Sequence, residues 1–207
     1  MITYGSSYRF TESLTFYIIL VNLIFFILQI LLPPFTDFLV LTPSLALSGC
    51  YFQFITYMFL HGGIAHIVLN MFVFAIFGFP LEQAIGKRKL ATVYFLSGFG
   101  SALFYILLMG VSDIPLLGAS GAVFGVLAAY AFRFPRTWVY IFGLFPLPAA
   151  VLIVFLLIEE TFFGILGLQP GIANFGHVGG IITGLLVMFY WKVRERERRR
   201  EFQFIWE

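Results

Sequence analysis

The sequence predicts an all-α, polytopic membrane protein in which six transmembrane helices form a bundle. Of its 207 residues, 61% are hydrophobic and 11% are charged, against about 25% charged in an ordinary soluble domain. Ten of the 22 charged residues lie within residues 192–207, so the other 191 residues share only twelve charges and could not present a soluble surface. The 28 Phe and 10 Tyr residues exclude a disordered chain. Six apolar runs complete the argument.

A spanning helix needs about 20 apolar residues. The first run, 14–32, stops at Pro33-Pro34 and has no signal-peptide pattern before it, so we expect it to stay as a membrane anchor. Five further runs follow along the chain, at 63–83, 89–110, 118–132 (short), 148–167 and 174–192. The segment between residues 33 and 62 is apolar but interrupted, which indicates an interfacial or partly inserted loop.

The Lys and Arg residues predict the orientation. With six helices all twelve fall on one side, which places the N- and C-termini in the cytoplasm; they are Arg9, Lys87, Arg88, Lys89, Arg133, Arg136 and the six after residue 191. The opposite loops are then expected to carry only acids: Asp37, Asp113, Glu159 and Glu160. We divide the chain into a membrane domain, 1–193, and a charged cytoplasmic tail, 194–207. Charges of alternating sign in this tail favour contact with lipid head groups over nucleic acid.

Three polar side chains reach a similar depth on three of the predicted helices. At a rise of ~1.5 Å per residue, Ser120 lies ~20 Å, His177 ~22 Å and Asn70 ~26 Å above the nearest cytoplasmic basic residue. All three depths fall in the outer half of a hydrocarbon core about 30 Å thick. A hydroxyl, an imidazole and an amide at one level can serve as nucleophile, general base and oxyanion donor in acyl transfer.

Each of these features also has a purely structural explanation. His177 could be satisfied by a backbone carbonyl, and glycines four residues apart are common where membrane helices pack. Such pairs occur in the fourth and sixth helices: Gly121 with Gly125, and Gly180 with Gly184. They predict close contact between these two helices, which would bring Ser120 and His177 together.

The histidines also raise the question of a metal. His66 and Asn70 are four residues apart and share one face of the second helix, while His61 precedes it. Three histidines could bind zinc. However, the sequence has no HExxH pattern, its single Cys50 excludes a Cys-based cluster, and we expect no carboxylate at this depth. We therefore expect neither a metal nor another cofactor.

Three separated motifs resemble those of the rhomboid family of intramembrane serine proteases. They are His61-x4-His66-x3-Asn70, Gly118-x-Ser120-Gly121 and His177-x2-Gly180-x3-Gly184. Glu82-x3-Gly86 is also similar to the family, and the likeness covers residues from about 10 to 193.

The resemblance implies a six-helix bundle and a serine endopeptidase that cuts transmembrane protein substrates near the external side. Ser120 would be the nucleophile and His177 its general base, in a dyad without a carboxylate. From the residues themselves, backbone contacts could orient that imidazole. Asn174, one turn earlier, is a further candidate, although the simpler role for it is a helix cap. His66, Asn70 and backbone N–H groups near Ser120 would bind the oxyanion, and His61 would help to organise the first loop. The residues that carry those backbone groups are Gly118, Ala119 and Gly121.

Two departures from the family pattern are visible, and two other functions remain open. Phe52-Gln53 stands where the family often has Trp-Arg, and Phe124 stands where many members have a Tyr that stacks on the catalytic histidine. A non-catalytic rhomboid-like protein that binds membrane clients would share the fold. A His-lined transporter or channel would depend little on Ser120. The implied location is the cell membrane of a prokaryote, and the oligomeric state is not predicted.

Overall fold

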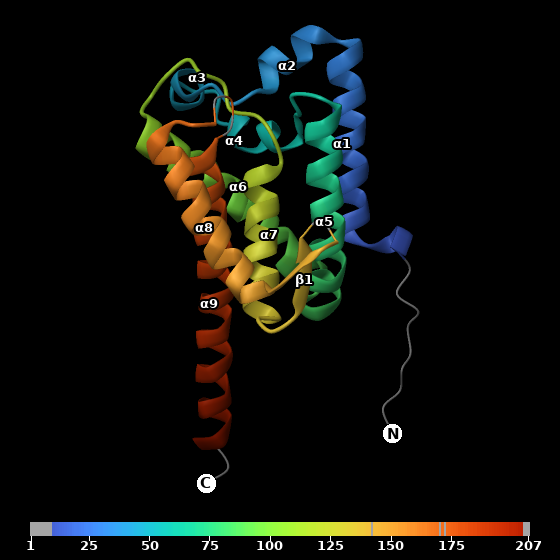
Figure 1. Cartoon of the computed structure of the whole chain (residues 1–207), viewed down its shortest axis with the longest axis vertical. Helices are drawn as coiled ribbons and strands as arrows, with labels where there is room; N and C mark the ends of the chain where they lie inside the picture. The colour runs from blue at the N-terminus through green and yellow to red at the C-terminus, as the bar shows by residue number, and fades with distance from the viewer. Residues whose placement is uncertain (1–9, 142, 170, 172, 205–207) are drawn as a thin grey trace.

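The six longest helices of the described residues form the bundle. They run alternately up and down (Figure 1). The computed structural model describes residues 10–141, 143–169, 171 and 173–204. The helices are α1 (Leu14–Leu31), α5 (Ile64–Ile85), α6 (Lys87–Met109), α7 (Ser120–Arg133), α8 (Ala149–Leu166) and α9 (Asn174–Phe204). Among the described residues, five of them are long and apolar enough to cross a membrane, and α7 is a shorter apolar helix. The predicted fold class is therefore confirmed.

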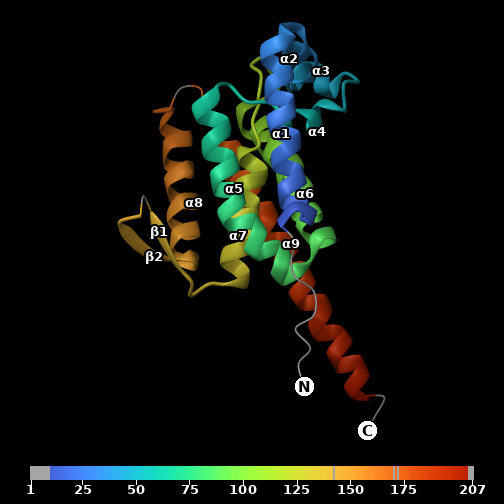
Figure 2. The same ribbon diagram turned by 90° about the vertical axis from the view of Figure 1, so that its right-hand side faces the viewer.

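Helix α7 lies in the middle of the bundle and contacts α5, α6, α8 and α9 (Figures 1 and 2). Its buried residues are small, mostly Ala, Gly and Val, so neighbouring helices can approach it closely from several sides. The outer faces of α1, α5 and α8 instead expose large apolar side chains, such as Leu31, Phe72 and Ile158. Those faces suit contact with lipid tails, as expected for an integral membrane protein.

The contact between α7 and α9 is backbone against backbone. A Cβ atom added to Gly180 would overlap the carbonyl oxygen of Gly121, and one added to Gly184 would overlap that of Gly125. The close approach that the glycine spacing predicts is therefore confirmed. It places the start of α9 beside the start of α7.

Between α1 and α5 the chain folds into short helices at the upper end of the bundle (Figure 1). These are α2 (Pro33–Leu39), α3 (Pro43–Leu47), α4 (Gln53–Thr56) and the 3-10 turn η2 (Tyr57–Phe59). The buried side chain of Gln53 fastens them together, since its amide donates to the Phe38 carbonyl (3.2 Å) and accepts from the Thr42 N–H (3.1 Å). The Tyr57 hydroxyl donates to the Gly98 carbonyl of α6 at 2.6 Å. The segment is thus compact and does not span.

A two-stranded hairpin at the lower end was not predicted. Strands β1 (Trp138–Ile141) and β2 (Phe145–Pro148) pair in antiparallel fashion, with Trp138 opposite Pro148. Each strand of a two-stranded sheet has one edge without a partner strand. Proline is tolerated in such edge strands because no N–H is needed for pairing on the open side. The hairpin occupies the Pro-containing stretch just before α8 (Figure 2).

The lower end of α1 is tied to α5 by Glu82, which is 2% exposed. Its two carboxylate oxygens accept the N–H groups of Leu14 (2.9 Å) and Thr15 (2.8 Å), and one also accepts the Thr15 hydroxyl (2.7 Å). A carboxylate is favoured there because the first N–H groups of a helix have no intrahelical partner. A 3-10 turn, η1 (Phe10–Glu12), precedes this junction.

Helix α1 begins and α9 ends at the same end of the bundle (Figure 1). The start of α6, with Lys87 and Arg88, and the α7–β1 connection, with Arg136, lie there as well. Arg9, Glu207 and the side chains of residues 198–204 fall outside the described part. Which end faces the cytoplasm stays a prediction, as does the division at residue 193, across which α9 continues without a break.

Candidate active site

The turn that leads into α7 depends on Gly118. Its φ of 129° lies in a region that favours glycine, and an added Cβ would come within 2.9 Å of the His66 ring. The Gly118 N–H donates to the Tyr57 carbonyl at 3.0 Å, which links the turn to the short helices above the bundle. This arrangement starts α7 below the upper surface and presents Ser120, its first residue, to a cavity.

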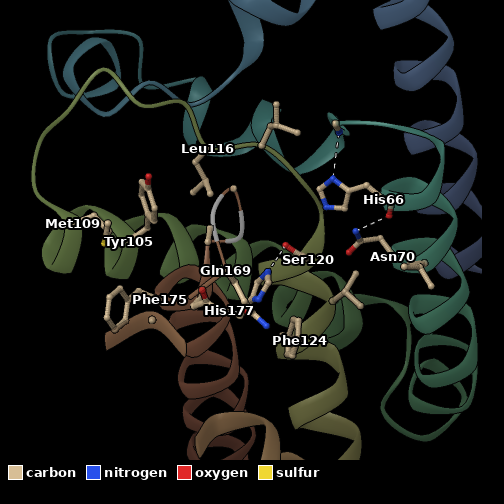
Figure 3. A pocket seen from close by; sticks show the side chains of 18 of the residues that line it. His66, Asn70, Tyr105, Met109, Leu116, Ser120, Phe124, Gln169, Phe175 and His177 are labelled. Atoms are coloured by element: carbon tan, nitrogen blue, oxygen red, sulfur yellow. Dashed lines mark hydrogen bonds between the residues drawn. The ribbon is translucent and has the colours of Figure 1, made fainter. Parts of the chain in front are cut away.

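Ser120 and His177 lie in hydrogen-bond contact (Figure 3). The distance from Ser120 Oγ to His177 Nε2 is 2.8 Å, although 57 residues separate the two in sequence. The Phe124 ring stacks on the imidazole, with centroids 4.4 Å apart and planes 18° from parallel. Phenylalanine therefore makes the stacking contact that the sequence leads us to expect at this position.

The other imidazole nitrogen faces a carboxylate, which contradicts the prediction of a site without one. Glu160 Oε1 lies 2.9 Å from His177 Nδ1. Glu160 is 6% exposed and belongs to α8, not to an external loop as its grouping with the other acids suggested. The expectation of no carboxylate at this depth is also wrong.

Asn174 contacts the carboxylate rather than the imidazole. Its Nδ2 donates to Glu160 Oε2 at 2.7 Å and to Gln169 Oε1 at 2.7 Å. It therefore orients Glu160, whereas the sequence suggested it as a direct partner of His177. A continuous series of polar contacts runs from Ser120 through His177, Glu160 and Asn174 to Gln169.

The sequence did hold a signal for Glu160. It lies eleven residues after the start of α8, so it is ~17 Å from the lower end of that helix, close to the ~20 Å found for Ser120. An ionisable residue inside an apolar run is costly and usually functional. Counting Glu160 among the loop acids concealed that signal.

His66 is held as a hydrogen-bond donor toward the cavity. The Gly62 N–H donates to His66 Nδ1 at 3.2 Å, so Nδ1 carries the lone pair and Nε2 carries the proton of the neutral ring. Asn70 lies one turn further along α5 and donates from Nδ2 to the His66 carbonyl at 2.9 Å. That bond uses one of its two amide protons. Figure 3 shows both residues across the cavity from His177, with Ser120 between them.

His61 lies outside the cavity lining and packs against His66. Its ring lies 5.1 Å from that of His66, edge to face. Gln29 of α1 holds its backbone, accepting from the His61 N–H (2.9 Å) and donating to its carbonyl (3.3 Å). Burial, together with the neighbouring His66, lowers the pKa of His61 from 6.5 to about 4, so the ring is neutral near pH 7. Across the residues that the structure describes, no group of three or more His, Cys, Asp or Glu could hold a metal ion.

A cavity of about 920 Å³ gives access to these residues. Its polar lining includes Ser120, His177, His66 and Asn70. Apolar side chains form other parts of the wall, among them Leu69 and Val73 of α5 and Leu156 of α8. A mostly apolar cavity with a few convergent polar groups is the usual form of a binding site.

The family model of the rhomboid domain matches residues 48–194, which run from α4 into α9 and include Ser120, His177 and Glu160. The chain belongs to the rhomboid family. It is 34% identical to RHOMBOID-like protein 6, mitochondrial, of Arabidopsis thaliana over 73% of this chain and 47% of that protein. It is 35% identical to Rhomboid-type serine protease 2 of Emericella nidulans over 65% of this chain and 26% of that protein.

The rhomboid family also includes proteins named as inactive. Inactive RHOMBOID-like protein 8 of Arabidopsis thaliana is 30% identical over 63% of this chain and 35% of that protein. In each of these three relatives the match spans less than half of the relative's length. These relatives come from a plant and a fungus, so they give no support to the expected prokaryotic cell membrane. The rhomboid domain and the apolar helices support an integral, multi-pass membrane protein.

Proposed function

We propose that this rhomboid is an intramembrane serine endopeptidase that cleaves transmembrane helices of membrane proteins near their external ends. The observation that carries the proposal is the 2.8 Å contact between Ser120 Oγ and His177 Nε2 at the base of the cavity. A serine hydroxyl is a weak nucleophile unless a base removes its proton. In this geometry the imidazole is within reach to do so.

The proposed reaction proceeds through an acyl-enzyme. His177 Nε2 takes the hydroxyl proton while Ser120 Oγ attacks the peptide carbonyl carbon, and the resulting tetrahedral intermediate carries the negative charge on oxygen. His177 then passes the proton to the leaving amine, which breaks the C–N bond. Water repeats the sequence on the ester, so the acid is released and Ser120 regains its proton.

The oxyanion would be held from two sides. The first N–H groups of α7 have no intrahelical acceptor, and the helix dipole adds positive potential at Ser120. From α5, the His66 Nε2–H faces the cavity and Asn70 has a second amide proton. Gly118, Ala119 and Gly121 would contribute through the backbone around the nucleophile.

Hydrolysis in a membrane also requires water, which the hydrocarbon core lacks. The cavity lies toward the upper end of the bundle, under the short helices α2–α4, and polar side chains line part of it (Figure 3). Water could enter from that side. The apolar wall formed by α5 and α8 would suit a substrate helix that has partly unwound, while lipid covers the outer helix faces.

A non-catalytic rhomboid that binds membrane clients is the alternative, because one relative is named as inactive. The test is covalent labelling of the purified protein with a fluorophosphonate. We expect one adduct, on Ser120, that disappears in Ser120→Ala and falls sharply in His177→Ala. Labelling should weaken as the pH falls, because a protonated His177 cannot accept the hydroxyl proton. Ser112→Ala removes a hydroxyl outside the cavity lining and is the matched control.

Cleavage of a transmembrane peptide in detergent completes the test. Parental protein and Ser112→Ala should cut the peptide, and Ser120→Ala should not, although it melts at the parental temperature. A folded parental protein that neither forms an adduct nor cuts any such peptide would favour the client-binding alternative. Cutting by Ser120→Ala at the parental rate would exclude Ser120 as the nucleophile.

A further inference from the structure

A site made of Ser120 and His177 alone does not need the contact between His177 and Glu160. Glu160 is nevertheless a buried carboxylate on the apolar helix α8. Ile158 and Phe162, the residues two positions away on either side, are exposed on the outer face of α8, whereas Glu160 points inward. An ionisable group in this environment is unfavourable unless it is paired and hydrogen-bonded. Glu160 meets this condition, because each of its two oxygens has a polar partner.

These two partners fix the direction of the carboxylate. Oε2 accepts from Asn174 Nδ2, whose other contact is Gln169 Oε1, so the amide group is also held. Oε1 is thereby left facing His177 Nδ1 at 2.9 Å. Since Asn174 and His177 both lie in the first turn of α9, the carboxylate from α8 binds one turn of one helix at two points.

The contact has a chemical consequence for His177. An ionised carboxylate only accepts hydrogen bonds, so its imidazole partner must carry the proton on Nδ1. The lone pair then resides on Nε2, which is the nitrogen that faces Ser120 Oγ. This is the tautomer that a general base requires. Phe124 restrains the same ring by stacking on its face, while Glu160 restrains rotation within the plane.

We propose that Glu160 is a positioning residue that completes a Ser120–His177–Glu160 triad. It holds His177 in the Nδ1–H tautomer and stabilises the imidazolium that forms when Nε2 takes the Ser120 proton. Glu160 gains no proton in the cycle. The inference rests on the proposed protease function and departs from the carboxylate-free dyad that the resemblance to the family implies.

The test compares Glu160→Gln, Glu160→Asp and Glu160→Leu with the parental enzyme on one transmembrane peptide. We expect kcat to fall at least tenfold in the Gln and Leu variants with little change in KM. About 10⁴-fold is lost when an amide replaces the carboxylate of soluble Ser-His-Asp proteases. Glu160→Asp should recover part of kcat, because it restores the charge at a longer distance. Asp37→Asn removes an exposed carboxylate outside the cavity lining and should keep the parental kcat.

A second measurement reads the tautomer without depending on turnover. In protein labelled with ¹⁵N-histidine, and with His177 assigned by its loss in His177→Gln, we expect protonated Nδ1 and unprotonated Nε2. Glu160→Leu should shift His177 toward the Nε2–H form while the melting temperature shows that the protein is folded. The proposal fails if His177 is already in the Nε2–H form in the parental protein, or if folded Glu160→Leu keeps the parental kcat and labelling rate. Failure of the protease function is a different result, namely a parental protein that is itself inert to fluorophosphonate.

Discussion

At the scale of single residues, Asn70 tests how the oxyanion is held. Its amide lies in the cavity lining and donates one proton to the His66 carbonyl, which leaves a second for substrate. We expect Asn70→Ala to lower kcat without abolishing turnover and to leave KM nearly unchanged. Loss of one oxyanion donor costs ~2.7–4 kcal/mol where donors are few, and the effect here should be smaller because His66 and the α7 N–H groups remain.

Steady-state kinetics on a transmembrane peptide measures this effect. Phe72→Ala, on the outer face of the same helix, removes apolar surface outside the cavity lining and is the control for a general disturbance of α5. An unchanged kcat in folded Asn70→Ala would remove Asn70 from the oxyanion site and leave it as a helix-surface amide.

His61 links the site to stability in acid. Burial lowers its pKa to about 4, whereas an exposed, unfolded His titrates near 6.5. Between pH 4 and pH 6.5 the His61 ring binds a proton in the unfolded chain but not in the folded chain. The stability that this group contributes is therefore fully present above pH 6.5 and is lost as the pH falls toward 4. At pH 5.5 the loss from this group is about 1.4 kcal/mol.

The comparison is with His61→Gln, whose side chain does not titrate. Melting temperatures of both proteins in detergent should be measured from pH 8 to pH 5.5. We expect the parental value to drop more steeply below pH 6.5 than that of the variant, while both stay level above it. Parallel curves would mean that His61 is accessible to protons in the folded protein.

The site residues show how far sequence reasoning reaches. Depth counting brought Ser120 and His177 to one level because both lie on regular helices whose rise per residue is fixed. Glu160 was missed although the same count applies to it, because its charge was assigned to a loop. The tautomer of His66 could not be predicted, since it depends on one backbone contact from Gly62.

At the scale of elements, the close glycine contact between α7 and α9 determines whether Ser120 and His177 meet. A side chain on Gly184 would overlap the backbone of Gly125, and neither backbone can move without separating the helices. We expect Gly184→Ala to lower stability by ~1–3 kcal/mol, as overpacking generally does, and to reduce fluorophosphonate labelling of Ser120. Leu186→Ala, on the outer face of the same helix, should change neither. Normal stability and labelling in Gly184→Ala would show that α7 and α9 can accommodate a methyl group between them, and that their close contact is not required.

The long helices were predictable as elements, but the segments between them were not. Apolar runs locate α1, α5, α6, α8 and most of α9 because spanning length is set by the bilayer. The short helices α2–α4 depend instead on distant contacts, such as the bonds that Gln53 makes to the backbone of Phe38 and Thr42. The hairpin β1–β2 pairs two short strands whose sequence carries two prolines, which gives little local signal.

At the scale of the whole molecule, the arrangement of charge predicts orientation in the membrane. The start of α6, with Lys87 and Arg88, and the α7–β1 connection, with Arg136, lie at one end of the bundle. Asp37 and Asp113 lie toward the other. Basic residues near helix ends are retained on the cytoplasmic side, so the end with the cavity should face outward. This orientation would place the proposed cleavage near the external surface.

Cysteine labelling tests this orientation directly. Cys50 is first replaced by Ser, and a single cysteine is then introduced as Arg136→Cys or Asp113→Cys, both at exposed positions. In sealed cells or vesicles of known sidedness, a membrane-impermeant maleimide should label Arg136→Cys only from the cytoplasmic side and Asp113→Cys only from the outside. Arg88→Cys, in the first turn of α6, should follow Arg136→Cys, because both positions lie at one end of the bundle. If Arg136→Cys and Asp113→Cys were both labelled from one side, the alternation of the helices would be wrong. If each were labelled from the side opposite to that expected, the fold would stand, but the cavity would open to the cytoplasm and substrates would be cut at their inner ends.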